Sequence, residues 1–143
     1  MKIITSRFGE IDIDENKIIA FPMGIPGFSD LKRYVLIEYK DPIKWLQAMD
    51  DPDVAFIVAN PFAIFPDYSV DIQDDMEALL GISEPKDLVV LNILTVRDSG
   101  ITANLKGPLV MNSANFKAAQ ILLEDEKYSF RTPLPALPKS VGR

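Results

Sequence analysis

Apolar residues along this 143-residue chain come in short runs separated by turn-forming residues. Residues 34–39 (YVLIEY) and 54–61 (VAFIVANP) are rich in β-branched and aromatic side chains, which favours strands. Residues 2–13 (KIITSRFGEIDI) place Arg7-Phe8-Gly9 between two such runs, which predicts a hairpin. Many short strands joined by tight turns predict a mostly β fold: one antiparallel, barrel-like domain with one or two short helices.

Helical spacing is confined to two segments. In residues 71–80 (DIQDDMEALL) the apolar side chains fall on one stripe, Asp71 can cap the first turn and Gly81 can end the helix. In residues 42–53 (PIKWLQAMDDPD) the apolar spacing around Trp45 predicts a short helical turn. The sequence therefore predicts one clear helix, near 71–80, and one shorter turn.

The domain is expected to cover residues 1–133, because no internal repeat or linker divides it. Residues 134–143, rich in proline and free of acid, are expected to form an extended, loosely held tail. Residues 118–123 (AAQILL) fit a helix or a strand equally well, since the run is too short for periodicity to decide.

Residues 21–30 (FPMGIPGFSD) combine two prolines and two glycines with large apolar side chains. The Pro-Gly pair at 26–27 suits the centre of a type II turn, in which glycine supplies the positive φ. We expect this double bend to be held by burial of Phe21, Ile25 and Phe28, because large apolar side chains usually lie inside.

The composition removes much of the usual catalytic equipment. The chain has no cysteine and no histidine, which excludes Ser-His-Asp and Cys-His systems and zinc sites built on those residues. It contains no phosphate loop, dinucleotide fingerprint or nucleophile elbow, so neither catalysis nor a cofactor is expected. No apolar run is long enough for a membrane span and the first residues lack a signal-peptide core, so we expect a cytoplasmic protein.

Negative charge is concentrated in the middle of the chain. The net charge is −6, and no lysine or arginine occurs from residue 45 to residue 85. That span carries nine acids: Asp50, Asp51, Asp53, Asp67, Asp71, Asp74, Asp75, Glu77 and Glu84. Nucleic-acid binding requires clustered Lys and Arg, so the span argues against it and favours a basic protein partner. A solvated acidic face is the alternative.

Aromatic loop residues next to this span indicate a protein-binding surface, because an apolar patch rimmed by charge of one sign is typical of one. The aspartate groups lack the ligand order of a calcium loop, so no metal site is expected. The candidate partner-binding residues are Asp50, Asp51, Asp53, Phe62, Phe65, Tyr68, Asp74, Asp75 and Glu77.

Several phrases, taken together and in order, resemble the FliW family of flagellar assembly factors. They are FGEIDID, IIAFPMGIPGF, KWLQAMDDPDVAFIVANP, LNILTV, ITANLKGPLVMN and AAQILL, and they extend from about Phe8 to Pro133. The combination of F-P-x-G-I-P-G-F with I-T-A-N-L-x-G-P is specific, although each phrase alone is weak.

The resemblance implies a small, cytosolic, β-barrel-like protein that is not an enzyme. FliW-like proteins bind newly made flagellin and, when free, bind the translational regulator CsrA and relieve its repression of the flagellin message. The resemblance thus implies two protein partners, flagellin and CsrA, with no direct nucleic-acid or membrane contact and a monomer when free. Two alternatives remain: a flagellin-only chaperone, and a carbohydrate or small-molecule enzyme that uses paired carboxylates.

Overall fold

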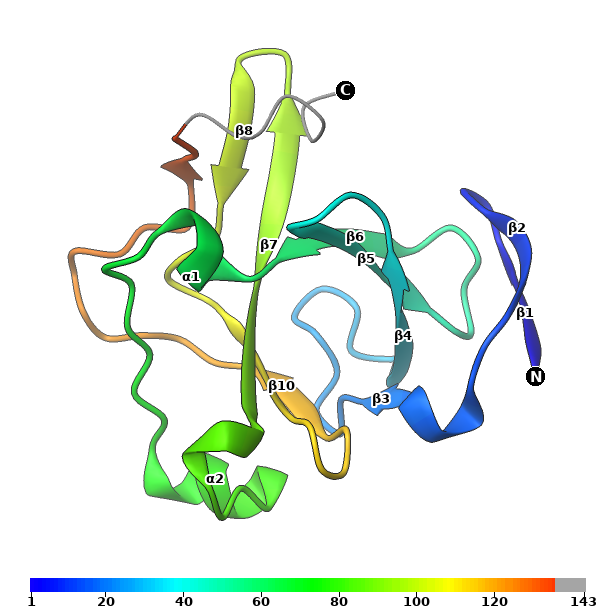
Figure 1. Ribbon diagram of the computed structural model, residues 1–143, viewed down its shortest axis with the longest axis horizontal. Coiled ribbons are helices and arrows are strands. Elements are labelled where there is room, and N and C mark those ends of the chain that lie inside the picture. Colours follow the sequence, from blue (N-terminus) through cyan, green and yellow to red (C-terminus); the bar gives the residue numbers. More distant parts are fainter. Residues whose placement is uncertain (136–143) are drawn as a thin grey trace.

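Antiparallel strands form the body of the protein, of which the computed structural model describes residues 1–135 (Figure 1). The strands are β1 (Lys2–Thr5), β2 (Gly9–Asp12), β3 (Ile19–Ala20), β4 (Arg33–Glu38), β5 (Ile43–Ala48), β6 (Ala55–Ala59), β7 (Leu88–Arg97), β8 (Gly100–Ala103), β9 (Leu109–Asn112), β10 (Ala118–Gln120) and β11 (Thr132–Pro133). The helices are α1 (Pro61–Ile64) and α2 (Asp74–Leu80), with 3-10 turns η1 (Glu15–Lys17) and η2 (Pro85–Asp87). The mostly β, antiparallel fold with two short helices is confirmed.

The main sheet curls until its two ends meet. Its order is β10-β9-β7-β6-β5-β4-β3, and β8 and β11 continue from the second half of the long strand β7. The amide of Ala20 in β3 donates to the carbonyl of Phe116, just before β10, at 2.9 Å. This single bridge, rather than a full ladder, joins the two ends within the described residues, so the domain is barrel-like.

The predicted N-terminal hairpin is present as β1 and β2, which form a separate two-stranded sheet. This hairpin packs on the outer surface of β5. The ring of Phe8 meets Trp45 edge to face at 6.0 Å, and the Arg7 guanidinium lies 4.1 Å from the same indole ring. The only tryptophan therefore anchors the hairpin to the sheet.

The helical turn predicted around Trp45 is wrong, because this segment is strand β5. Its backbone pairs with β4 on one side and with β6 on the other. Leu46 packs in the interior and Trp45 lies outside, which is the alternation of a strand. Pairing on both edges overrides a weak local spacing that also fits a helix.

The helix predicted over 71–80 exists but begins later, at Asp74. Asp71 does not cap it: Gln73 occupies the N-cap position and makes no side-chain hydrogen bond there. Gly81 ends the helix as predicted, with a left-handed φ of +71°. Leu80 is fully buried whereas Leu79 is 41% exposed, so the apolar stripe is narrower than its spacing indicates.

The remaining predictions on secondary structure are correct in some segments and incomplete in others. Residues 118–120 form strand β10, so the first half of AAQILL is a strand, and residues 121–123 belong to neither a helix nor a strand. The sequence analysis missed helix α1, whose first turn is capped by the Asn60 side chain accepting from the amide of Phe62 at 2.9 Å. In the expected tail, Leu134 still donates to the carbonyl of Ile101 at 3.1 Å, and residues 136–143 lie outside the described residues.

The FPMGIPGFSD segment is buried at two of its three anchors. Phe21 and Ile25 are each 2% exposed, but Phe28 is 38% exposed and stacks edge to face on Phe56, so its predicted burial is wrong. The Pro-Gly turn at 26–27 is confirmed, with a φ of +87° at the glycine. Gly24 is also required, because a Cβ there would lie 2.6 Å from the Cα of Ser29.

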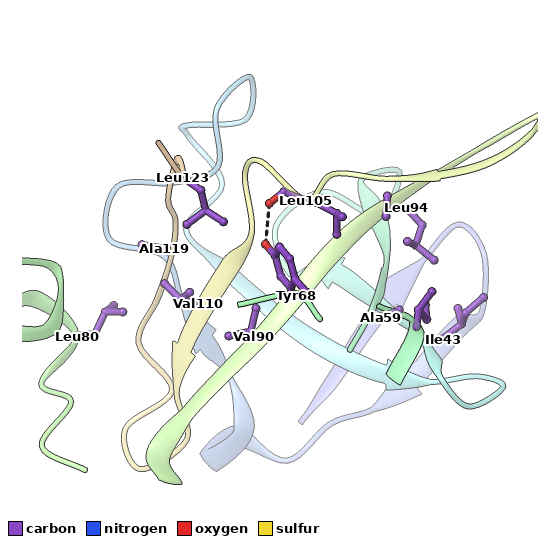
Figure 2. Packing of buried hydrophobic residues seen from close by; sticks show 12 residues of the cluster. Ile43, Ala59, Tyr68, Leu80, Val90, Leu94, Leu105, Val110, Ala119 and Leu123 are labelled. Atoms are coloured by element: carbon purple, nitrogen blue, oxygen red, sulfur yellow. Dashed lines mark hydrogen bonds between the residues drawn. The ribbon is translucent and has the colours of Figure 1, made fainter. Parts of the chain in front are cut away.

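The interior contains two hydrophobic clusters. One fills the curl of the sheet and includes Phe21, Ile25 and Tyr34. The other includes Ile64 of α1 and Leu80 of α2 and packs these helices against the sheet. Figure 2 shows its buried side chains. At its centre, the Tyr68 hydroxyl donates to the carbonyl of Leu105 at 2.7 Å. This second cluster holds α2 and the segment that follows β10 on the same side of the molecule.

Candidate protein-binding surface

A groove of about 490 Å³ lies between α2 with its preceding loop and the segment that follows β10. We call it the acidic groove. It is lined by Ser69, Asp71, Gln73, Asp75, Met76, Gln120, Ile121, Leu122, Leu123, Glu124, Asp125 and Tyr128. Four of these residues are acids, several are apolar and, among the described residues, none of those lining it is basic. The groove thus combines apolar surface with negative charge.

Long-range contacts hold the segment after β10 against the loop before α2. The amide of Leu123 donates to the carbonyl of Lys106 at 2.8 Å, and the Leu123 side chain is buried. The Tyr128 hydroxyl accepts from the amide of Ser69 at 3.0 Å, and its ring packs edge to face on Tyr68 at 4.8 Å. These contacts fix the wall that carries Glu124 opposite the wall that carries α2.

The C-terminal end of α2 is anchored by two asparagines, Asn112 at the end of β9 and Asn115 in the loop that follows. The side-chain amides of Asn112 and Asn115 donate to the carbonyl of Leu80 at 2.9 and 3.0 Å. The Asn112 side-chain oxygen also accepts from the amide of Ala114 at 2.8 Å, which shapes the loop itself. Helix ends leave carbonyls without an intrahelical partner, so these two donors satisfy a group that burial would otherwise penalise.

Most of the charge of the acidic groove is uncompensated. Asp125 pairs with Lys127 at 3.6 Å. Asp71, Asp75 and Glu124 take part in no ion pair within the part of the chain that the structure describes. Beside them, Leu122 exposes 64% of its surface. A large apolar side chain next to unpaired carboxylates is suited to contact with a basic protein surface.

The nine candidate residues do not form one surface. Asp74, Asp75 and Glu77 are exposed on α2, and Asp75 lines the acidic groove. The loop carrying Asp50, Asp51 and Asp53 joins β5 to β6 beside the β1–β2 hairpin, on the opposite side of Figure 1 from both helices. The acids that are close together in the sequence therefore lie on different sides of the folded protein.

The β5–β6 loop is also partly neutralised by local contacts. Asp50 forms an ion pair with Arg33 at 2.6 Å, which raises the pKa of that guanidinium. Asp53 accepts a hydrogen bond from the Ser6 hydroxyl, and the carboxylate of Asp51 accepts from the amide of Asp53 at 3.0 Å. These partners give the loop carboxylates a structural role in holding the hairpin and the turn.

The aromatic candidates differ in exposure. Phe62 is 43% exposed, Phe65 is half-buried, and Tyr68 is buried. Burial raises the pKa of Tyr68 to about 12, against the opposing effect of a hydrogen bond with Asn92. Tyr68 is thus a core residue that supports Phe62, whose ring lies 5.8 Å away. The aromatic surface available to a partner is accordingly smaller than the sequence indicates.

Three features of the groove escaped sequence reasoning: the position of Glu124 and Asp125 opposite α2, the exposure of Leu122, and the anchoring role of Asn112. The acidic turn at 124–126 is visible in the sequence, but nothing local shows which element it faces. Only contacts between residues far apart in the sequence bring this acidic turn close to α2.

The surface contains the elements of protein recognition. Within residues 1–135, no group of three or more carboxylates is placed to hold a metal ion. None of the described helices is long and apolar enough to cross a membrane. An antiparallel β domain with an acidic, partly apolar groove is typical of a protein-binding module.

Comparison with known proteins identifies the family. The model of the FliW protein family matches residues 2–134. Flagellar assembly factor FliW of Alkaliphilus metalliredigens is 43% identical over 133 residues, covering 90% of this chain and 82% of that protein. Flagellar assembly factor FliW of Treponema denticola is 38% identical, covering 100% of this chain and 99% of that protein. The chain belongs to the FliW family.

A solved structure agrees with this assignment. The crystal structure of a flagellar assembly factor FliW superposes with a TM-score of 0.88 at 35% sequence identity, covering 93% of this chain and 96% of that one. The family resemblance noted in the sequence is thereby confirmed. The protein is a flagellar assembly factor and not an enzyme, as the names of its relatives indicate.

Proposed function

We propose that this flagellar assembly factor is a cytoplasmic partner-switching regulator. It binds flagellin and, when free of flagellin, binds the translational regulator CsrA and relieves its repression of flagellin mRNA translation. The observation that carries the CsrA half of the proposal is the acidic groove, where Asp71, Asp75 and Glu124 surround the apolar Met76 and Leu122.

The chemistry of the groove suits a partner that binds RNA. A protein that binds RNA must neutralise phosphates with lysine and arginine, so it presents a basic surface. Unpaired carboxylates attract such a surface and accelerate its encounter, and the exposed Leu122 adds apolar contact area. The same carboxylates repel RNA, so their arrival near a basic RNA site disfavours the bound message. Direct nucleic-acid binding by this protein is unfavourable for the same reason.

Charge reversal in the groove tests this proposal. The variant carries Asp75→Lys together with Glu124→Lys, both on exposed side chains, so its fold should be kept. A loss of up to about 1 kcal/mol of stability is expected, because a lysine in the first turn of α2 opposes the helix dipole. Association of this variant with purified CsrA should be slowed by about tenfold at low salt, because charges near an interface act mainly on the association rate. The difference should shrink at high salt, where the Debye length falls to about 3 Å at 1 M.

Asp51→Lys together with Asp98→Lys is the matched control, since it makes the same change in net charge on the β5–β6 loop and the β7–β8 turn, both away from α2. It should leave the association rate within about twofold of the wild-type rate, which is the scatter expected of a screened distant charge. Equal slowing by both variants would show that only net charge matters and that the groove is not the contact site. Equal rates for the groove variant and the wild type would refute the role of the groove.

The flagellin half of the proposal has a separate test. Gel filtration of the protein with flagellin should give a complex, and added flagellin should displace the protein from CsrA. A complex with flagellin but none with CsrA would replace this proposal with a flagellin-only chaperone.

A further inference from the structure

Strand β4 has one edge that is filled along its whole length and one that is not. Strand β5 pairs with it from Tyr34 to Glu38, whereas β3 pairs only with Arg33 and Tyr34. In the part of the chain that the structure describes, no strand covers the other edge from Val35 to Glu38. An uncovered edge exposes backbone donors and acceptors that another extended chain can use.

The hydrogen bonds at the start of β4 show which groups face this open edge. The amide of Met49, next to β5, donates to the carbonyl of Arg33 at 2.9 Å. On the opposite side, the amide of Phe21, next to β3, donates to the carbonyl of Lys32 at 2.8 Å. Backbone groups alternate between the two edges of a strand. The N–H and C=O groups of Leu36 and Glu38 therefore point to the open edge.

A cavity of about 650 Å³ runs along the same four residues of β4. Its apolar lining comes from Ile13, Ile37, Met111 and Phe116, among others. Its charged lining consists of three carboxylates, Asp12, Asp14 and Glu38, and one lysine, Lys17; Glu38 also pairs with Lys44 outside the lining, which leaves the rim with a small net negative charge. We call this cavity the β4-edge groove. It offers a backbone hydrogen-bonding edge, apolar contact surface and a net negative rim in one place.

We propose that the β4-edge groove binds an extended peptide segment of another protein, with apolar residues alternating with basic ones, as an added strand next to β4. The open backbone groups of Leu36 and Glu38 require an extended occupant, because only an extended chain matches their spacing. The net negative rim selects basic side chains. This groove does not use α2, so the inference is independent of the function proposed for the acidic groove.

Charge also decides between a foreign peptide and a second copy of this chain. Two copies joined through this edge would bring Asp12, Asp14 and Glu38 of one molecule toward the same carboxylates of the other, and like charges disfavour that contact. A basic peptide gains from the same rim.

The test uses the full-length protein and an octapeptide of alternating valine and lysine as the probe. On titration to millimolar peptide, NMR should show that the amide signals of Leu36 and Glu38 shift and that their hydrogen exchange slows. The control is the same peptide with alternate backbone nitrogens methylated, which keeps every side chain but removes the donors on one edge. The methylated peptide should bind at least tenfold more weakly. No shift with the unmodified peptide, or equal binding of the two peptides, would overturn the proposal.

Two variants of Glu38 separate the effect of its backbone N–H from the effect of its carboxylate. Glu38 is exposed, and its carboxylate forms an ion pair with Lys44 at 3.3 Å. Glu38→Ala removes the carboxylate, and Glu38→Pro removes the carboxylate and the outward N–H while leaving the pairing of Ile37 with β5. Peptide affinity of the proline variant should be about tenfold below that of the alanine variant, the usual effect of one hydrogen bond. Equal affinities in variants with native melting temperatures, or slow exchange at Leu36 that appears with protein concentration alone, would contradict a peptide-binding edge.

Discussion

Truncation of Phe21 tests whether the FPMGIPGFSD segment is a structural anchor. The side chain is 2% exposed and its ring lies 5.2 Å from that of Tyr34, edge to face. Tyr34, the neighbouring ring, is itself fully buried and cannot swing in from the surface to fill the space that Phe21→Ala would leave. A buried Phe→Ala change costs about 3–5 kcal/mol, and loss of the aromatic pair favours the upper half of that range. We therefore expect the free energy of unfolding to fall by about 4 kcal/mol.

Phe28→Ala in the same segment is the matched control. Phe28 also stacks edge to face, on Phe56 at 5.2 Å, but it is 38% exposed. Its truncation removes less buried apolar surface than Phe21→Ala does and leaves no closed cavity, so it should cost about 1–2 kcal/mol. The two variants remove the same atoms from one loop and differ mainly in burial.

Urea denaturation followed by far-UV circular dichroism measures both variants against the wild type. The midpoint should shift with little change in the slope, because the surface exposed on unfolding is nearly the same. In a thermal melt, Phe21→Ala should lower the midpoint by about 12 °C, taking roughly 3 °C per kcal/mol for a chain of this size. Equal destabilisation by the two variants would refute the argument from burial. Wild-type stability of Phe21→Ala with loss of a partner would make the segment an interface.

Two further predictions concern the anchor of α2 and the buried tyrosine. Asn112→Ala should lower the free energy of unfolding by about 1–3 kcal/mol and speed hydrogen exchange in α2, because it removes a buried side chain that donates to the Leu80 carbonyl and accepts from the Ala114 amide. Asn115→Ala should cost clearly less, since Asn115 is exposed and Asn112 still serves the same carbonyl; an equal cost would contradict the anchor. Burial raises the pKa of Tyr68 to about 12, so the folded protein holds this proton more tightly than the unfolded chain, whose tyrosine titrates near 10. The protonated Tyr68 contributes fully to stability below about pH 10, and up to about 2–3 kcal/mol of that contribution is lost as the pH rises to about 12. Urea melts across this pH range should show a smaller loss of unfolding free energy in Tyr68→Phe than in the wild type. The same pH dependence in both proteins would refute the assignment.

Local chemistry was enough to predict the fold class and several of its elements. The β1–β2 hairpin, strands β4 and β6, the turn at 26–27 and the end of α2 at Gly81 all follow from residue types that allow few backbone conformations. Glycine at a positive φ, proline in a turn and β-branched residues in a strand act within a few residues of themselves. Such signals do not depend on the rest of the molecule.

The tertiary structure decided what the segment around Trp45 became and which acids share a surface. Spacing there fits a helix, but two neighbouring strands each supply a ladder of hydrogen bonds, and that pairing determines β5. The acids of the β5–β6 loop and those of α2 are separated by the sheet, whereas Glu124 reaches α2 through the burial of Leu123 and the packing of Tyr128 on Tyr68. An electrostatic surface depends on distances in space, and those distances were set by core packing between residues far apart in the chain, which no local pattern records.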